Sequence, residues 1–223
     1  MKLGVLFSGG KDSTFATFIA KSQGYEISCL ISLFSKNKES YMFHTPSISK
    51  TSIQAEAIGI PLLVKETEGE KEEELKDLKE AIKKAKDKFG IDGIVTGAVE
   101  SVYQASRIQK ICDELDLECF NPLWKKSQTS LLNELIKNDF EVIVTGVFAF
   151  PLDKEWLGKK IDEDFVKEII ELEKKYKINP AGEGGEFESF VLNCPLFKKK
   201  LKVKSFEDSK EGENSWRREI ELK

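Results

Sequence analysis

The chain has 223 residues, of which 40% are hydrophobic and 33% are charged, and its formal net charge is −4 at pH 7. This length allows one large domain or two smaller ones. Because acidic and basic residues are intermixed, the composition gives no general attraction to nucleic acid, and no run approaches the ~18 apolar residues of a membrane span. The four cysteines form no C-x-x-C pair, so we expect neither a zinc site nor a disulfide framework. We therefore expect a soluble cytoplasmic protein.

The first segment of the chain predicts a strand, a tight turn and a helix. An apolar run, residues 3–7, precedes the turn, and apolar residues return at helical spacing from Phe15 onward. The turn consists of Ser8, Gly9, Gly10, Lys11, Asp12 and Ser13. Glycines let the backbone approach a ligand, the first amides of a helix attract anions, and the hydroxyls and the lysine add donors. The spacing is not that of a Walker loop, so we predict a phosphate-binding loop of another kind, with an ordinary strand–turn–helix junction as the alternative.

Strands and helices then alternate, which predicts a doubly wound parallel sheet. The expected elements are a strand at 26–34, a helix at 48–58, a strand at 61–65, a helix from about 75 to Gly90 and a strand at 91–96. Such sheets bind ligands at the carboxyl ends of their strands. Ile31 and Leu33 lie at that end of the second strand, where we expect backbone groups to hold a nucleotide base. The loop that follows contains His44, the only histidine, which is either a nucleotide contact or an ordinary surface residue.

A polar helix face is expected after the fourth strand. Gly97 opens the loop that would aim this helix toward the phosphate loop. Glu100, Tyr103 and Arg107 are spaced i, i+3 and i+7, so we expect them to share a face near the helix start, with Gln104 on the same side. A solvated polar face without a function is the alternative. The buried stripe of the helix is expected to contain Val102, Ala105, Ile108 and Cys112.

The remaining residues predict a smaller α+β domain, so we divide the chain into 1–121 and 122–223. The expected elements are a helix around 131–135, a strand at 140–148, a helix at 162–176 and strands at 190–192, 200–206 and 215–222. Lysines alternate with Leu201 and Val203 in the run 198–204. We interpret this run as a lysine-protected edge strand and not as a nucleic-acid patch.

A second informative stretch joins the last predicted helix to an apolar strand. It reads NPAGEGGEFE, residues 179–188, and holds three glycines and three carboxylates beside an aromatic residue. A loop of this composition is either a binding loop or a flexible surface turn.

Taken together, several stretches resemble the diphthine–ammonia ligases, a family within the N-type ATP pyrophosphatases. They are SGGKDS at 8–13, SYMFHTP at 40–46, TGAVESVYQASR at 96–107, NPLW at 121–124 and NPAGEGGEFESFVLNCPLFK at 179–198. The first motif is shared by the wider superfamily, whereas its combination with GEGGEFE is more specific. Relatives of that family often carry aspartate where this chain has Asn179.

The resemblance implies an ATP-dependent ligase that converts diphthine, a modified histidine of translation elongation factor 2, into diphthamide. ATP would activate the carboxylate as an acyl-adenylate, and free ammonium would displace AMP. The catalytic residues would be Asp12, Glu100, Tyr103 and Arg107, with Asp12 also binding Mg²⁺. The ATP site would comprise Ser8 to Ser13, Ile31, Leu33, His44 and Gly97. The substrate site would comprise Gln104, Trp124, Glu183, Gly184, Gly185, Glu186 and Phe187. The oligomeric state stays open, and a homodimer is compatible with the sequence.

Two other functions stay open at this point. A tRNA-modifying enzyme with the same phosphate loop usually needs a reactive cysteine pair and a basic surface, and the sequence indicates neither. A non-catalytic adenine-nucleotide-binding protein would not need an acidic, glycine-rich loop in a second domain.

Overall fold

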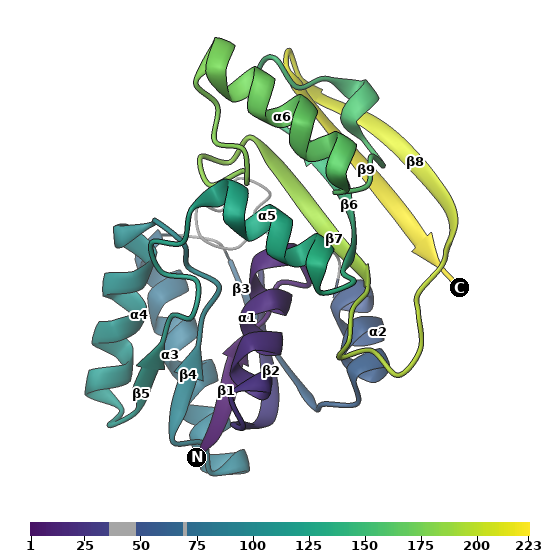
Figure 1. Cartoon of the computed structure of the whole chain (residues 1–223). Coiled ribbons are helices and arrows are strands. Elements are labelled where there is room, and N and C mark those ends of the chain that lie inside the picture. Colours follow the sequence, from purple (N-terminus) through teal and green to yellow (C-terminus); the bar gives the residue numbers. More distant parts are fainter. Residues whose placement is uncertain (36–47, 69–70) are drawn as a thin grey trace. The chain divides into compact units, whose positions relative to one another are not determined.

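The computed structural model describes residues 1–35, 48–68 and 71–223 (Figure 1). The chain divides into two compact units, Met1–Trp124 and Lys125–Lys223. We expected the boundary after residue 121, whereas the first unit ends at Trp124. Among the helices that the structure describes, none is long and apolar enough to cross a membrane.

The first unit contains a parallel sheet of five strands in the order β3-β2-β1-β4-β5. Its elements are β1 (Lys2–Leu6), α1 (Lys11–Ser22), β2 (Glu26–Ser35), α2 (Ile48–Ile58), β3 (Leu62–Thr67), α3 (Lys71–Phe89), β4 (Gly93–Val95), α4 (Val102–Glu114) and β5 (Glu118–Phe120). The predicted doubly wound sheet is therefore confirmed. The short strand β5 was not predicted, because three residues with an exposed glutamate carry no apolar run.

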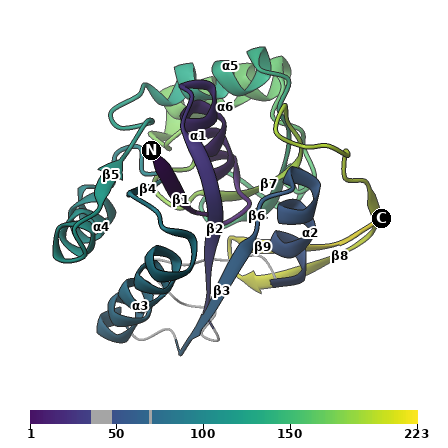
Figure 2. The same ribbon diagram turned by 90° about the horizontal axis from the view of Figure 1, so that it is seen from below.

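Helices cover both faces of this sheet (Figure 2). On one face α3 and α4 share a hydrophobic cluster with β2 and β4, in which Leu78, Ile82 and Ile108 are buried. On the other face lie α1 and α2. Val102 was expected in the buried stripe of α4 but is 67% exposed. It is the first residue of the helix, and the buried positions of α4 begin only at Ile108.

The strand order reverses beside β1, which places a ligand site there by topology. From β1 the chain proceeds to β2 and β3 on one side, and later to β4 and β5 on the other. In open parallel sheets, ligands bind at the carboxyl ends of the strands at such a switch point. The loops after β1 and β4, which carry the predicted phosphate loop and Gly97, start at that edge of the sheet.

The second unit contains an antiparallel sheet of four strands in the order β7-β6-β9-β8. Its elements are α5 (Gln128–Lys137), β6 (Glu141–Val147), the 3-10 turn η1 (Lys154–Trp156), α6 (Glu163–Tyr176), β7 (Phe187–Asn193), β8 (Val203–Gly212) and β9 (Ser215–Leu222). Helix α6 packs through Phe165, whose ring lies 5.3 Å from the Trp156 ring and 5.8 Å from the Phe187 ring.

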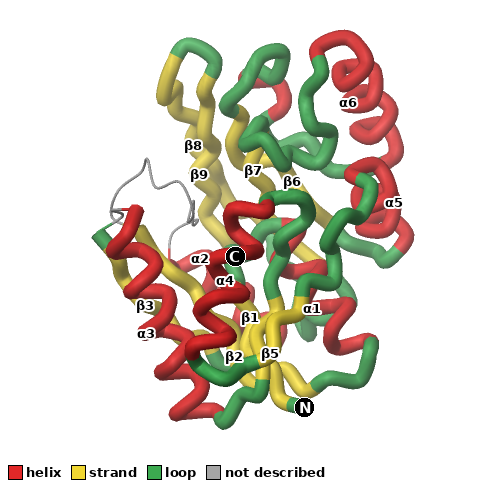
Figure 3. The backbone as a smooth tube through the Cα atoms, turned by 90° about the vertical axis from the view of Figure 1, so that its left-hand side faces the viewer, coloured by secondary structure: helices red, strands yellow, loops and turns green. Residues whose placement is uncertain are grey.

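The strands β8 and β9 form a long hairpin, and β8 is an edge of the sheet (Figure 3). The predicted edge strand is confirmed, but β8 runs from Val203 to Gly212, so Lys204 is the only lysine of the run 198–204 that lies in it. Lys204 pairs with Glu221 across the hairpin at 2.6 Å. Arg218 forms a bidentate pair with Asp208, at 2.6 and 2.8 Å, and its guanidinium lies 3.8 Å from the centre of the Phe206 ring.

The Arg218–Asp208 pair should make the stability of the second unit sensitive to acid. Its hydrogen bonds to Arg218 lower the pKa of Asp208 from the ordinary value of 3.8. A lowered folded-state pKa contributes stability that is present above the unfolded pKa and is lost as the pH falls through the folded pKa. Asp208→Asn should therefore lower the melting temperature at pH 7, and the difference from the unmodified chain should narrow in acid below about pH 4.

Asp164→Asn is the matched control, measured by the same thermal melts. Asp164 pairs with Lys167 on the surface of α6, where its side chain is 84% exposed, compared with 11% for Asp208. Exposed pairs contribute little, so this variant should melt close to the unmodified chain. Equal melting temperatures for the two variants at pH 7 would contradict the role given to Asp208.

Candidate active site

The predicted phosphate loop forms the junction between β1 and α1. Gly9 has a φ of +78°, which glycine adopts without a side-chain clash. Gly10 caps α1 in an extended conformation, and in the described part of the chain no side chain caps this helix. The hydroxyls of Ser8 and Ser13 lie 3.1 Å apart, and Ser13 Oγ accepts the Ser8 amide at 3.2 Å. Two hydroxyls therefore lie beside the first amides of a helix, an arrangement suited to an anion.

A glutamine of α2 supports this loop. Gln54 is fully buried, and its Nε2 donates a hydrogen bond of 2.9 Å to the carbonyl oxygen of Gly9. A Cβ atom on Gly9 would stand only 2.0 Å from Gln54 Oε1. Gln54 was not predicted as a site residue, because a glutamine inside a helix gives no sign of the distant loop that it contacts.

The loop after β4 approaches the start of α1 more closely than a side chain would allow. A Cβ atom on Gly97 would stand 2.8 Å from the Ser13 nitrogen and 2.9 Å from the Asp12 carbonyl carbon. We expected Gly97 to contact the nucleotide. The structure places it directly against the phosphate loop, where only glycine permits this packing.

Lys11 and Asp12 form an ion pair in the first turn of α1. Lys11 Nζ lies 2.7 Å from Asp12 Oδ2, and the lysine side chain is 5% exposed. The other carboxylate oxygen, Asp12 Oδ1, is buried without a hydrogen-bond partner among the described residues. A buried acceptor without a donor costs stability, so this oxygen is fit to meet a cation or a ligand.

A metal at this position would rely on Asp12 and on the ligand. Within the described ranges, no group of three His, Cys, Asp or Glu side chains lies close enough to hold a metal ion. Mg²⁺ usually takes one or two carboxylates and completes its shell with phosphate oxygens and water. The single carboxylate of Asp12 at the phosphate loop is therefore compatible with the expected binding of Mg²⁺.

The polar face of α4 differs from the expectation in one member. Ser101 caps α4, and its hydroxyl accepts the amide of Gln104 at 3.3 Å. Glu100 therefore precedes the helix and is exposed, so the expected i, i+3, i+7 face is wrong for this residue. Tyr103 and Arg107 do contact each other, with the guanidinium carbon 3.4 Å from the ring centre. Arg107 Nε is buried and has no hydrogen-bond partner in the part of the chain that the structure describes, which leaves a charged donor for an anion.

The Asn121–Trp124 segment fixes the loop that holds Gly97. Asn121 Oδ1 accepts a hydrogen bond of 2.5 Å from Thr96 Oγ1, which in turn accepts the Ala98 amide at 3.1 Å. The end of β5 is thereby joined to the loop after β4. Trp124 is half-buried, and its amide donates to the Asn121 carbonyl at 3.0 Å.

Ile31 and Leu33, which were expected to hold the nucleotide base, lie on β2. Ile31 and Leu33 are buried, and both side chains belong to the cluster beneath α3. The carbonyl oxygen of Ile31 accepts the Phe7 amide at 2.8 Å. A contact of these residues with a base stays a prediction. His44 lies outside the described residues.

The glycine-rich loop of the second unit is ordered by its own carboxylate. Glu186 is 6% exposed, and its oxygens accept hydrogen bonds from Asn179 and Gly184. Phe187 begins β7, and its ring packs on Phe165 in the core. Because a buried ring offers no free face to a cation, the structure argues against the expected contact of Phe187 with the substrate. Gly184 and Gly185 are exposed and Glu183 is half-buried.

Comparison with known proteins covers both units. The diphthamide synthase N-terminal domain matches residues 1–119, and the diphthamide synthase C-terminal domain matches residues 127–221. The chain belongs to the diphthamide synthase family.

Curated relatives match most of this chain and most of their own length. The chain is 35% identical over 226 residues to a protein of Bos taurus named diphthine–ammonia ligase, which covers 93% of this chain and 84% of the relative. Proteins of the same name from Rattus norvegicus and Danio rerio are each 36% identical over 226 residues, with 84% and 88% of the relative covered. The resemblance noted from the sequence motifs is therefore confirmed at the level of the family.

Two of the four cysteines, Cys29 and Cys194, are poorly suited to nucleophilic chemistry. Burial raises the pKa of Cys29 to about 12 and the pKa of Cys194 to about 11, so both are thiols at neutral pH. The structure also brings together Cys112 and Cys119, a pair that the sequence spacing did not indicate. Their mutual hydrogen bond raises the pKa of Cys112 and lowers that of Cys119.

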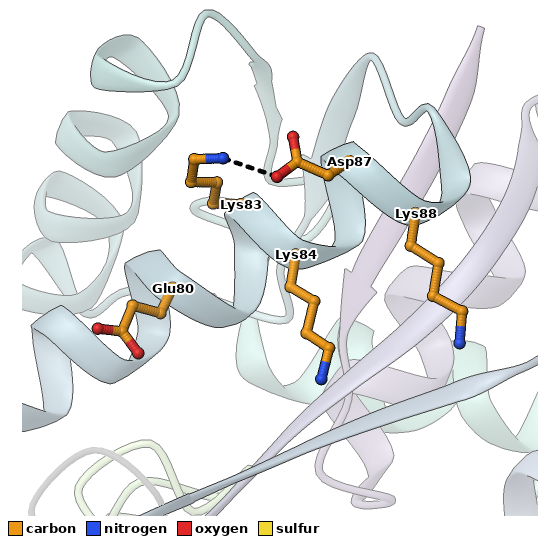
Figure 4. A pocket seen from close by; sticks show the side chains of 5 residues that line it. All are labelled: Glu80, Lys83, Lys84, Asp87 and Lys88. Atoms are coloured by element: carbon orange, nitrogen blue, oxygen red, sulfur yellow. Dashed lines mark hydrogen bonds and ion pairs between the residues drawn. The ribbon is translucent and has the colours of Figure 1, made fainter.

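A charged hollow on α3 lies apart from these motifs (Figure 4). It is lined by Glu80, Lys83, Lys84, Asp87 and Lys88. Lys83 and Asp87 pair at 2.6 Å across one helical turn, and both side chains are more than 60% exposed. The hollow is thus the solvated face that the spacing of α3 predicts, and we assign it no ligand.

The contact between Gly9 and Gln54 yields a test of the phosphate loop. Gly9→Ala should lower the affinity for ATP, because the new methyl group would displace Gln54 and strain a left-handed residue. Gly90→Ala is the control, since Gly90 also has a positive φ, of +61°, but a Cβ atom there would meet nothing within 4 Å. In both variants a left-handed alanine should destabilise the fold by about 1–2 kcal/mol. Only Gly9→Ala should also lower the affinity for ATP, measured by equilibrium titration. Unchanged ATP affinity in Gly9→Ala would overturn the assignment of the loop.

Proposed function

We propose that this protein is a diphthine–ammonia ligase, which uses ATP and ammonium to convert the carboxylate of diphthine into the amide of diphthamide. The protein substrate is translation elongation factor 2, and the reaction belongs to the cytoplasm. The observation that carries the proposal is the phosphate loop, in which Asp12 Oδ1 has no hydrogen-bond partner among the described residues, in a chain of the diphthamide synthase family.

The proposed reaction has two steps. A carboxylate oxygen of diphthine attacks the α-phosphorus of ATP, the bond between the α-phosphorus and the bridging oxygen breaks, and pyrophosphate leaves. Ammonia then attacks the acyl carbon of the adenylate, the acyl C–O bond breaks, AMP leaves and the nitrogen loses a proton. Adenylation is needed because a carboxylate oxygen is otherwise a poor leaving group.

The residues of the first unit serve these steps by binding and orienting the phosphates. The hydroxyls of Ser8 and Ser13 and the first amides of α1 would hold the β- and γ-phosphates, and Lys11 would neutralise them. Bound Mg²⁺ supplies further charge neutralisation for the phosphate oxygens, and Asp12 would hold it. Displacement at phosphorus depends mainly on such positioning and charge stabilisation.

Arg107 is the best candidate to meet the reacting anions. Its guanidinium is stacked on the Tyr103 ring, which fixes its plane, and its buried Nε has no hydrogen-bond partner among the described residues. A planar guanidinium donates two parallel hydrogen bonds to a carboxylate or a phosphate, which lysine does not reproduce. We place Tyr103 and Gln104 beside it. Glu100 keeps the role implied by the family resemblance only as a prediction.

The second unit would recognise the cationic part of the substrate. Diphthine carries a trimethylammonium group, which donates no strong hydrogen bond and is recognised through carboxylates and aromatic faces. The glycine-rich loop offers Glu183, and its exposed glycines allow close approach. The aromatic contact expected of Trp124 stays a prediction.

Among the alternatives, a cysteine-dependent tRNA-modifying enzyme is disfavoured. The raised pKa values of Cys29, Cys112 and Cys194 keep these three groups protonated at neutral pH. The pKa of the fourth cysteine, Cys119, is lowered by its hydrogen bond with Cys112, so the disfavour rests on the other three. A non-catalytic nucleotide-binding protein would bind ATP without forming AMP and pyrophosphate, which distinguishes it from the ligase.

Product analysis with an Asp12 variant tests the proposal. The unmodified chain should form AMP and pyrophosphate only when ATP, Mg²⁺ and diphthine-bearing elongation factor 2 are all present. Asp12→Asn keeps the shape of the side chain but removes its charge, and should reduce the rate at limiting Mg²⁺ by about ten- to a hundredfold. Asp113→Asn, at an exposed position of α4, is the control and should leave the rate unchanged. Release of ADP and phosphate, or a full rate in Asp12→Asn, would contradict the proposal.

A further inference from the structure

A buried carboxylate holds the glycine-rich loop from within. Glu186 Oε1 accepts the backbone amide of Asn179 at 2.8 Å and its side-chain Nδ2 at 2.7 Å. Glu186 Oε2 accepts the amide of Gly184 at 2.9 Å. The two oxygens of one carboxylate therefore join the beginning of the loop to its tip.

A glutamine of α5 fixes the same segment through a second set of contacts. Gln128 Nε2 donates to Asn179 Oδ1 at 3.1 Å, and Gln128 Oε1 accepts the amide of Ala181 at 3.0 Å. Both ends of the Asn179 side-chain amide are thus engaged. Gln128 was not predicted as a functional residue, because nothing in the sequence at a helix start indicates which loop the side chain will contact.

The loop backbone wraps this carboxylate too closely to tolerate a side chain at one position. A Cβ atom on Gly184 would stand 2.6 Å from Asn179 Nδ2 and 2.7 Å from Glu186 Oε1. At the neighbouring Gly185, a Cβ atom would meet nothing within 4 Å. The two glycines therefore have different roles, the first in packing and the second in backbone conformation.

We propose that Gln128, Asn179 and Glu186 form a loop clamp, in which Glu186 is a positioning residue and Glu183 is the carboxylate that meets the cationic substrate. The identity of the substrate rests on the proposed function. An ammonium group that bound Glu186 would have to compete with three N–H donors already in place, whereas Glu183 lies in the span that these donors hold. Groups that recognise a ligand bind best when a second set of residues fixes their position in advance.

The clamp is tested by combining hydrogen exchange with substrate kinetics. In Glu186→Gln one acceptor oxygen is replaced by an NH₂ group, so the amides of segment 179–185 should exchange faster. The KM for diphthine-bearing elongation factor 2 should rise by about ten- to a hundredfold, and the KM for ATP should stay unchanged. Glu183→Gln should raise the same KM without any change in exchange. In the double variant the two effects should be less than additive, because a displaced loop no longer presents residue 183.

Glycine variants provide the matched pair if Glu186→Gln folds poorly. Gly184→Ala should reproduce its effects by pushing on the clamp, and Gly90→Ala, at the end of α3 and outside the loop, should not raise the KM. Unchanged exchange in Glu186→Gln together with a raised KM would show direct contact with the substrate and overturn the positioning role. Faster exchange with an unchanged KM would remove the loop from the substrate site. Failure of the unmodified chain to form the amide would overturn the proposed function but not the clamp, whose exchange readout needs no substrate.

Discussion

The close approach of Gly97 to the first turn of α1 is the contact on which the candidate active site depends. A methyl group at that position would stand 2.8 Å from the Ser13 nitrogen. The backbones of the loops after β1 and β4 are therefore in direct contact, with no room for a side chain between them. Because these two strands are neighbours at the point where the strand order reverses, the sheet itself brings their loops together. The Thr96–Asn121 hydrogen bond then joins the end of β5 to the same place. The phosphate loop is thus a product of the sheet topology as much as of its own residues.

Both units fix a glycine-containing loop with a glutamine from elsewhere in the sequence, which is fully buried in the first unit and half-buried in the second. In the first unit Gln54 of α2 binds the carbonyl of Gly9, and in the second unit Gln128 of α5 binds Asn179 and Ala181. Glycine gives a loop the freedom to approach a ligand but also raises the entropic cost of holding it in one shape. These hydrogen bonds offset that cost and leave the loop ordered before the ligand arrives.

The fold was predictable from the sequence where periodicity was strong, and the site was predictable where a motif was contiguous. The apolar periodicity between residue 75 and Gly90 predicted α3, and the six residues from Ser8 to Ser13 predicted the phosphate loop. The errors arose where the role of a residue depends on tertiary contacts. Glu100 was predicted to lie in the helix, but Ser101 is the N-cap of α4 and Val102 is its first residue. Composition made Glu186 and Phe187 resemble substrate contacts, yet one is engaged by the loop itself and the other packs in the core.

The central claim is that this chain forms an amide on a protein carboxylate with nitrogen from ammonium and energy from ATP. The most direct measurement supplies nitrogen-15 ammonium, ATP and Mg²⁺ to the chain with diphthine-bearing elongation factor 2, and determines the mass of the modified peptide. The account predicts that the peptide gains one labelled nitrogen at the diphthine residue only when ATP is present, with one AMP formed for each amide. A peptide that keeps its carboxylate while AMP accumulates, or that is unchanged with no turnover of ATP, would contradict it.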